Sequence, residues 1–386
     1  MTPFAFNTTA GIRLGSGIAA TLGEIAGARL GKSVLFITDA GLVSLGLCQP
    51  AIASLEKAGC SVAVFDQVEA DPSLATLMAA TQAARAINAS GIVGFGGGSS
   101  MDVAKLAALL CGSGEDIDEA WGVANAKGPR LPLVLVPTTA GTGSEVTPVS
   151  IITVSGDEKR GVSSPVILPD LAILDPDLTL GLPASITAAT GIDAMVHAIE
   201  AYASKSANNN PMSRMLAVEA LRLLGANIET AVNHGSDLAA RSAMLLGSML
   251  AGMAFANSPV AAVHALAYPV GGIFHVPHGL SNALVLPHVL RFNAPEAAHL
   301  YAELAPHAFP DIDMSAGTQG VCAQFIERLA ALSADLGLKT RLREVGVSES
   351  DLPRMASDAM KQTRLLVNNP RDVSEADALS IYRAAY

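Results

Sequence analysis

The chain has 386 residues, of which 50% are hydrophobic and 15% charged, and its formal net charge is −11. A chain of this length can bury more than one core, which predicts at least two domains. Its acidic balance argues against nucleic-acid binding, which requires basic surface. No basic segment followed by an apolar one opens the sequence, so no signal peptide is expected. The four cysteines lack CxxC spacing and are expected to be reduced in a cytoplasmic protein.

The first half of the sequence alternates strand-like and helix-like segments. Short apolar runs predict buried strands at residues 33–39, 60–66, 90–98 and 131–139. Helical patterns, such as the one over residues 74–89, separate them. This alternation predicts a parallel α/β sheet.

The pattern changes near residue 180. Residues 169–185 are rich in proline and turn-forming residues, and long Ala/Leu-rich helical segments follow. The clearest of these helices are expected at residues 213–233, 236–257 and 320–337. We therefore expect an α/β domain over residues 1–180 and an all-helical domain over residues 181–386, with the active site in the cleft between them.

A long stretch within the second domain carries no formal charge. Between Arg241 and Arg291 there is no Asp, Glu, Lys or Arg. The apolar part is long enough to cross a membrane. However, Asn257 and Pro259 interrupt it, and the small residues suit tight helix packing, so we expect a buried core and no membrane association.

Four histidines lie in this uncharged stretch, and buried imidazoles require partners. His264 and His278 are two of them, and a carboxylate and another imidazole, Asp193 and His197, precede the stretch at a spacing of four residues. That spacing places both on one helix face. Together the four residues would offer three nitrogens and one oxygen to a divalent metal. The alternative is a set of core histidines and a surface aspartate.

The other two histidines of the stretch are weaker candidates for metal ligands. His275 is separated from His278 by a turn, so we expect it to face the substrate or to support the ligands. His288 lies further along and is expected to be structural.

Two loops that follow predicted strands suit a phosphorylated cofactor. Residues 96–105, GGGSSMDVAK, join a strand to a helix, whose N-terminal amide groups can bind a pyrophosphate. Residues 137–147, PTTAGTGSEVT, supply hydroxyl groups and flexible backbone. Each could instead be an ordinary turn. Asp39 ends an early strand, where it could accept hydrogen bonds from a ribose and repel a 2′-phosphate, or simply cap a helix.

These motifs together resemble those of the iron-containing (group III) alcohol dehydrogenases. The resemblance rests on GGGSSMDVAK, PTTAGTGSEVT, GIDAMVHAIEAY and the spacing from His264 to the PHG sequence at His278. It covers nearly the whole chain. It implies an α/β dinucleotide-binding domain followed by a helical metal-binding domain, as in dehydroquinate synthase and glycerol dehydrogenase. It also implies NAD, a homodimer and Fe(2+), with Zn(2+) as the alternative metal.

The resemblance carries over to particular residues. The family's metal ligands match Asp193, His197, His264 and His278. Its cofactor contacts match Asp39, Gly97, Gly98, Ser99, Thr138, Thr139, Thr147, Lys159 and Leu178. Tyr268 is a departure, because many members carry a proton-relaying histidine there. We therefore expect His275, Tyr268 or bound water to relay the proton.

The resulting expectation is an NAD-dependent alcohol dehydrogenase acting on a small neutral alcohol or aldehyde, since the uncharged stretch offers no cation to an acidic substrate. Three alternatives share parts of this pattern. A dehydroquinate synthase-like lyase would need basic residues near the metal. A maleylacetate reductase-type enzyme generally lacks the metal ligands. A non-catalytic protein could bind NAD or metal without turnover.

Overall fold

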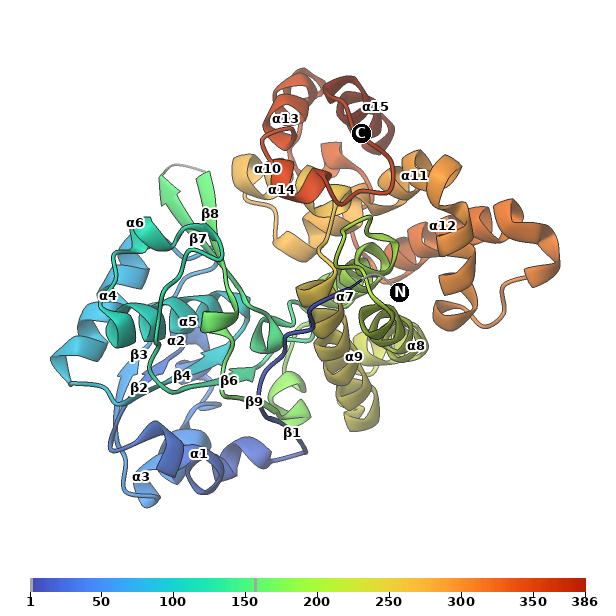
Figure 1. The fold of residues 1–386 in the computed structure, drawn as a ribbon. Coiled ribbons are helices and arrows are strands. Elements are labelled where there is room, and N and C mark those ends of the chain that lie inside the picture. Colours follow the sequence, from blue (N-terminus) through green and yellow to red (C-terminus); the bar gives the residue numbers. More distant parts are fainter. Residues whose placement is uncertain (1–2, 156–157) are drawn as a thin grey trace. The chain divides into compact units, whose positions relative to one another are not determined.

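The computed structural model describes residues 3–155 and 158–386, which form two compact units (Figure 1). The first unit combines Asn7–Thr139 with Gly143–Leu180. The second combines Gly181–Tyr386 with Ala140–Thr142 and the segment that ends at Phe6. The main division therefore falls between Leu180 and Gly181, but two short upstream segments pack with the helical unit.

The first unit is built around a six-stranded sheet whose strands are all parallel, in the order β1-β9-β6-β4-β2-β3. In that order the strands are Ile12–Leu14, Leu171–Leu174, Leu133–Pro137, Gly91–Gly96, Ser33–Ile37 and Ser61–Phe65. The four predicted strands are β2, β3, β4 and β6, and the predicted α/β class is confirmed. A smaller sheet has the order β5-β8-β7, formed by Gly122–Val123, Glu158–Ser163 and Val149–Ser155.

Helices cover both faces of the large sheet, and alternate residues of each strand point to opposite faces. On one side, Val34 and Phe36 pack with α1 (Leu22–Leu30) and α3 (Gln49–Lys57). On the other side, Leu35 and Ile37 pack with α4 (Leu74–Ala86) and α5 (Gly98–Ser113). The unit is completed by α2 (Ala40–Ser44), α6 (Ile117–Ala120) and the 3-10 helices η1 (Ile18–Thr21), η2 (Ser144–Val146), η3 (Pro165–Ile167) and η4 (Pro176–Thr179).

One prediction about this unit needs correction. Residues 169–185 were expected to be a turn-rich connection, but Leu171–Leu174 form β9 inside the sheet. All four residues of β9 are buried between β1 and β6. The strand is short because Asp175 and Pro176 end it.

The second unit is a helical bundle. Its helices are α7 (Ala184–Ala203), α8 (Pro211–Asn233), α9 (Leu238–Asn257), α10 (Ala262–Phe274), α11 (His278–Ala308), α12 (Gly317–Asp335), α13 (Leu352–Ala359), α14 (Thr363–Leu366) and α15 (Glu375–Ala385). Three 3-10 helices complete it: η5 (Met314–Ala316), η6 (Leu342–Val345) and η7 (Glu349–Asp351). The predicted helices over 213–233, 236–257 and 320–337 correspond to α8, α9 and α12. Buried residues surround nearly the whole circumference of α7, which makes it the central helix.

Within the described residues, α9 is the single helix long and apolar enough to cross a membrane by length and composition. It packs against α7 and α8, and 56% of its apolar stretch is buried inside the protein. Small residues permit this packing, because a Cβ atom at Gly247 would lie 2.8 Å from Leu224 Cγ of α8. The helix ends at Asn257, one of the two residues expected to interrupt the apolar run.

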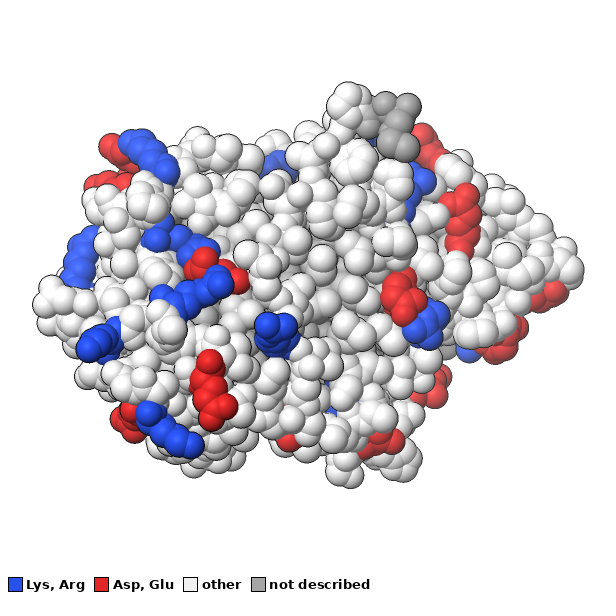
Figure 2. Space-filling view, turned by 60° about the horizontal axis from the view of Figure 1, so that its bottom comes forward, with Lys and Arg blue, Asp and Glu red and all other residues white. Residues whose placement is uncertain are grey.

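Charged side chains are sparse on the surface, and the two signs are interspersed on the face that Figure 2 shows. Several of them form exposed ion pairs, including Arg291 with Glu327 and Arg328 with Asp311. Pairs of this kind contribute little to stability. The fold therefore depends on its apolar cores.

Candidate active site

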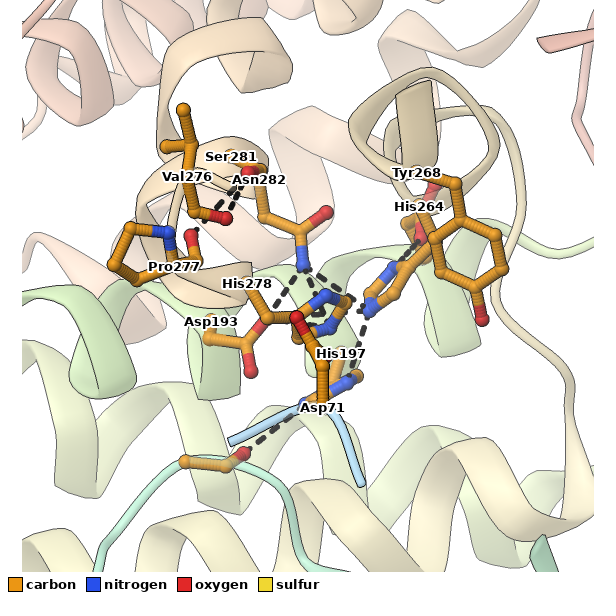
Figure 3. A network of polar contacts seen from close by, with 12 residues as sticks. Asp71, Asp193, His197, His264, Tyr268, Val276, Pro277, His278, Ser281 and Asn282 are labelled. Carbon is orange, nitrogen blue, oxygen red and sulfur yellow. Dashed lines mark hydrogen bonds and ion pairs between the residues drawn. The ribbon is translucent and has the colours of Figure 1, made fainter. Parts of the chain in front are cut away.

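Four side chains with metal-binding atoms converge inside the helical unit (Figure 3). Asp193, His197, His264 and His278 each offer one ligand atom, and these atoms all lie within 4.8 Å of one another. The first three residues are buried, whereas the side chain of His278 is 38% exposed. His278 is therefore the member of the group that faces solvent.

Helix α7 supplies two of these residues and one that the sequence analysis did not identify. Asp193, His197 and Glu200 follow one another at spacings of four and three residues, so they lie on one face of the helix. Glu200 Oε2 lies 2.6 Å from His264 Nδ1, and its Oε1 accepts a hydrogen bond of 2.7 Å from the Val263 amide. The buried carboxylate thus holds both the imidazole of His264 and the first turn of α10.

The hydrogen bonds at Nδ1 determine where the lone pairs of two imidazoles lie. His197 Nδ1 lies 3.2 Å from the Gly141 carbonyl oxygen, which can only accept, and His264 Nδ1 faces the Glu200 carboxylate. Both Nδ1 atoms therefore carry the proton, and both Nε2 atoms carry a lone pair. Burial lowers the pKa of His197 to about 3, so this ring remains neutral at physiological pH.

Those two lone pairs face each other. His264 Nε2 lies 3.0 Å from His197 Nε2 with no proton available between them. His278 Nε2 lies 3.6 Å from Asp193 Oδ1 in the same group. Metal ligands about 2.0–2.1 Å from a common ion stand roughly 3 to 4 Å apart, so these two separations suit a shared divalent cation, which would relieve the repulsion.

Asn282 is the second contributor that the sequence analysis missed. Its amide nitrogen lies 2.6 Å from Asp193 Oδ1 and 3.3 Å from Nε2 of both His264 and His278 (Figure 3). Asn282 follows His278 by four residues on α11, which is the same spacing that linked Asp193 to His197. Its Oδ1 is buried and has no hydrogen-bond partner among the described residues. The amide thus presents its positive end to the lone pairs that a cation would bind.

A glycine permits α11 to approach α7 closely at this point. A Cβ atom at Gly279 would lie 2.4 Å from the Ala189 carbonyl oxygen, closer than atoms can pack. The absence of a side chain lets the first turn of α11 rest on the backbone of α7. That contact places His278, the first residue of α11, beside Asp193.

The other candidate residues are not among the four clustered ligand residues. His275 ends α10 in the left-handed conformation with φ of 54° and is exposed. The ring centre of Tyr268 lies 6.3 Å from that of His278, and the Tyr268 hydroxyl accepts a hydrogen bond of 3.2 Å from Arg364. His288 lies further along α11, where burial lowers its pKa to about 4.

The expected cofactor residues lie in the α/β unit, most of them at one edge of the large sheet. Asp39 follows β2, Gly97 follows β4, Thr138 follows β6 and Leu178 follows β9. These four strands are neighbours and run parallel, so their carboxyl ends share an edge. Dinucleotides bind at this edge in open α/β sheets.

The two loops also approach each other there. Gly97 precedes α5, whose first two residues are Gly98 and Ser99, and a Cβ atom at Gly97 would lie 3.8 Å from Thr139 Oγ1. The Thr138 amide donates a hydrogen bond of 3.0 Å to the Gly96 carbonyl oxygen. The amide groups of the first turn of α5 therefore lie beside residues 137–147, which we call the threonine loop.

Three of the expected cofactor residues already have partners within the protein. Asp39 caps α2, with Oδ1 accepting a hydrogen bond of 3.0 Å from the Leu42 amide. Thr147 is buried and accepts a hydrogen bond from Lys105, while Lys159 forms an ion pair with Asp71. These contacts give Asp39 and Thr147 structural roles, and their expected contacts with the cofactor stay predictions.

Comparison with known proteins identifies the family. Residues 9–176 match the family described as iron-containing alcohol dehydrogenase, and residues 187–386 match the C-terminal part of the Fe-containing alcohol dehydrogenase family. The chain is 42% identical over 362 residues to long-chain-alcohol dehydrogenase 1 of Geobacillus thermodenitrificans, covering 93% of this chain and 91% of that protein.

Solved structures of related oxidoreductases support the same assignment. A crystal structure of 1,3-propanediol oxidoreductase superimposes with a TM-score of 0.95 at 36% identity, and 100% of both chains is covered. Sulfoacetaldehyde reductase from Bifidobacterium kashiwanohense in complex with NAD⁺ has a TM-score of 0.87 at 28% identity, covering 100% of this chain and 99% of that one.

The fold and the clustered ligand atoms define a metal-dependent, NAD-linked oxidoreductase. The chain belongs to the iron-containing alcohol dehydrogenase family and interconverts an alcohol and its carbonyl compound by hydride transfer. The enzyme class predicted from the motifs is confirmed, and the comparisons support it over the lyase alternative.

The contact at Gly279 leads to a first prediction. Gly279→Ala would force α11 away from α7, which should lower the free energy of unfolding by about 1–3 kcal/mol and reduce metal content. Gly225→Ala is the matched control, because its Cβ atom would lie 2.3 Å from the Ala308 carbonyl oxygen at the other end of α11. It should destabilise the protein but retain metal. Equal metal loss in both variants, measured by mass spectrometry, would contradict this role of Gly279.

The carboxylate of Glu200 leads to a second prediction. Glu200→Gln replaces the acceptor of the His264 Nδ1 proton by a weaker one, so metal affinity should fall by roughly 10- to 100-fold. The measurement is metal retention during titration with a chelator. Glu303→Gln serves as control, because Glu303 is a carboxylate of the same helical unit that accepts its hydrogen bond from Tyr202. Unchanged affinity in Glu200→Gln would show that Glu200 does not support the metal.

Proposed function

We propose that this enzyme holds Fe(2+) through Asp193, His197, His264 and His278 and oxidises a small neutral alcohol with NAD. The observation that carries the proposal is the pair of imidazole lone pairs facing each other at 3.0 Å, which a cation would satisfy. A set of three nitrogens and one oxygen suits Fe(2+) or Zn(2+), and the family supports iron as the first choice.

The metal, when bound, acts as a Lewis acid that lowers the pKa of the alcohol and polarises the carbonyl group in the reverse reaction. The protein prepares the site for this chemistry. Glu200 and the Gly141 carbonyl fix two imidazoles with their lone pairs directed inward. Asn282 holds the Asp193 carboxylate. Little reorganisation is then needed when the reaction starts.

We propose that NAD binds at the carboxyl edge of the large sheet. The pyrophosphate would lie against the first turn of α5 at Gly97, Gly98 and Ser99, where free amide groups and the helix dipole favour an anion. The other expected contacts are Asp39, Thr138, Thr139, Thr147, Lys159 and Leu178. The carboxylate of Asp39 would accept hydrogen bonds from a ribose and disfavour NADP.

The neutral substrate is inferred from the charges around the ligand group. Residues 242–290, which include α10 and the first part of α11, carry no formal charge. Arg364 does reach this region from α14, but it donates to the hydroxyl of Tyr268. Short primary alcohols and diols are therefore the proposed substrates. A panel that includes an aldehyde with a sulfonate or carboxylate group would reveal a preference for anions instead.

We also propose that the enzyme is a cytoplasmic homodimer, as the family resemblance implies. Sedimentation of the purified protein would establish the number of subunits.

Metal dependence is the decisive test. His264→Ala removes one of the two facing nitrogens, so it should abolish both metal retention and alcohol-dependent NADH formation. Treatment of the unsubstituted enzyme with a chelator should have the same effect on activity, and Fe(2+) should restore it better than Zn(2+). Full turnover by a metal-free preparation would refute the proposal.

Proton release is a separate prediction. We propose that His275 relays the proton in place of the histidine that many relatives carry at the position of Tyr268. His275→Ala should lower kcat about 10²- to 10⁴-fold and change the pH dependence of the rate, while metal content remains normal. An unchanged rate and pH profile would exclude His275. Tyr268→Phe, which removes the hydroxyl bonded to Arg364, would then test the alternative.

A further inference from the structure

Helix α11 presents an asparagine amide to the proposed metal ligands, and the proposed chemistry gives this amide no role beyond holding one carboxylate. Asn282 is fully buried, and Figure 3 shows its amide nitrogen directed at the ligand group. The nitrogen lies 2.6 Å from Asp193 Oδ1 and 3.3 Å from Nε2 of both His264 and His278. An amide nitrogen can only donate, so its two hydrogens are shared among lone pairs of three ligand residues.

The orientation of this amide leaves its oxygen without a partner. Asn282 Oδ1 is buried and has no hydrogen-bond partner within residues 3–155 and 158–386. An unpaired buried acceptor opposes folding, so the oxygen contributes nothing that would favour this orientation. The contacts of the amide nitrogen with the ligand group therefore determine how the side chain lies.

The imidazole lone pairs cannot serve an amide hydrogen and a metal ion at the same time. A neutral imidazole carries one lone pair on its ring nitrogens, and that of His264 lies on Nε2 because Glu200 accepts the proton of Nδ1. The same Nε2 atom is a proposed metal ligand. Binding of a cation therefore removes the contacts of the amide with His264 and His278 and leaves a buried N–H group without these acceptors.

The contact of the amide with Asp193 is different, because carboxylate oxygens carry several lone pairs. Asp193 can accept from the amide of Asn282 and still bind a cation. This hydrogen bond therefore stabilises the protein with and without metal, and it cancels when the two forms are compared. The contacts with the two imidazoles do not cancel.

We propose that Asn282 stands in for the metal: its amide pairs the lone pairs of His264 and His278 when no cation binds them, and it competes with a cation for the same lone pairs. This inference rests on the metal site proposed above. The amide stabilises the metal-free protein and lowers its affinity for metal. The enzyme can then release and regain its metal while the ligand residues stay together.

The test is the affinity for Zn(2+), measured by competition with a fluorescent chelator, together with the melting temperatures of the metal-free and the Zn(2+)-loaded protein. Asn282→Leu removes the amide and keeps a side chain of similar size. It should tighten Zn(2+) binding about 3- to 30-fold, since the metal no longer displaces a buried donor. By linkage, the melting temperature of the metal-free protein should fall more than that of the loaded protein.

Asn293→Leu is the matched control. Asn293 is also a buried asparagine of α11, but its amide nitrogen donates to Asn369 and Tyr301. This variant should lower both melting temperatures equally and leave Zn(2+) affinity unchanged. Glu200→Gln should weaken Zn(2+) binding, so this variant and Asn282→Leu should change the affinity in opposite directions.

Unchanged or weaker Zn(2+) binding by Asn282→Leu would overturn the proposal, and so would equal tightening in Asn293→Leu. If Asn282→Leu does not stay folded without metal, the rate of Zn(2+) release from the loaded protein to excess chelator decides. Release should be slower than from the unsubstituted enzyme, because no amide takes the lone pairs as the metal leaves, and equal or faster release would overturn the proposal. Equal Zn(2+) affinity of His264→Ala and the unsubstituted enzyme would instead refute the proposed metal site.

Discussion

The arrangement of the helical unit depends on bringing several lone pairs together in a buried place. Imidazole nitrogens and a carboxylate oxygen repel one another when they share a small dry volume, and only a positive group makes their approach favourable. The chain meets this requirement with rigid elements. Asp193 and His197 are held by α7, His264 by the first turn of α10 and His278 by the first turn of α11.

The contacts behind the ligands explain why these helices meet where they do. Glu200 joins α7 to α10 by accepting from both the imidazole of His264 and the amide of Val263. Gly279 joins α11 to α7 by leaving room for a backbone carbonyl. A carboxylate and a glycine that are not among the four clustered residues thus help to set the geometry of the site.

Much of the fold and of the ligand group could be predicted from the sequence, because the clearest sequence patterns were local. Buried apolar runs indicated β2, β3, β4 and β6, and the spacing of Asp193 and His197 indicated one helix face. β9 was missed because its four apolar residues lie between prolines and aspartates. β8 was missed because charged residues such as Glu158 and Arg160 give no apolar run. In both cases tertiary pairing outweighs the local pattern.

Glu200 and Asn282 were also missed, although the same spacing rule could have found them. Glu200 follows His197 by three residues and Asn282 follows His278 by four. The signal was present but ambiguous, because a glutamate or asparagine in a helix is usually exposed. Only the packing of α7, α10 and α11 shows that these two side chains face the ligand group. Their contribution depends on tertiary structure and could not be assigned from spacing alone.

Gly141 has a consequence for attempts to redesign this enzyme. It lies within the threonine loop, yet Ala140–Thr142 pack with the helical unit, where the Gly141 carbonyl oxygen faces His197. A Cβ atom at this position would lie 2.7 Å from Thr190 Cβ, so no larger residue fits without displacing the backbone. The loop proposed to bind the cofactor therefore also supports His197, one of the proposed metal ligands. A designer who varies this loop to change cofactor preference should keep residue 141 constant, because a larger residue there would disturb His197, a proposed metal ligand, at the same time.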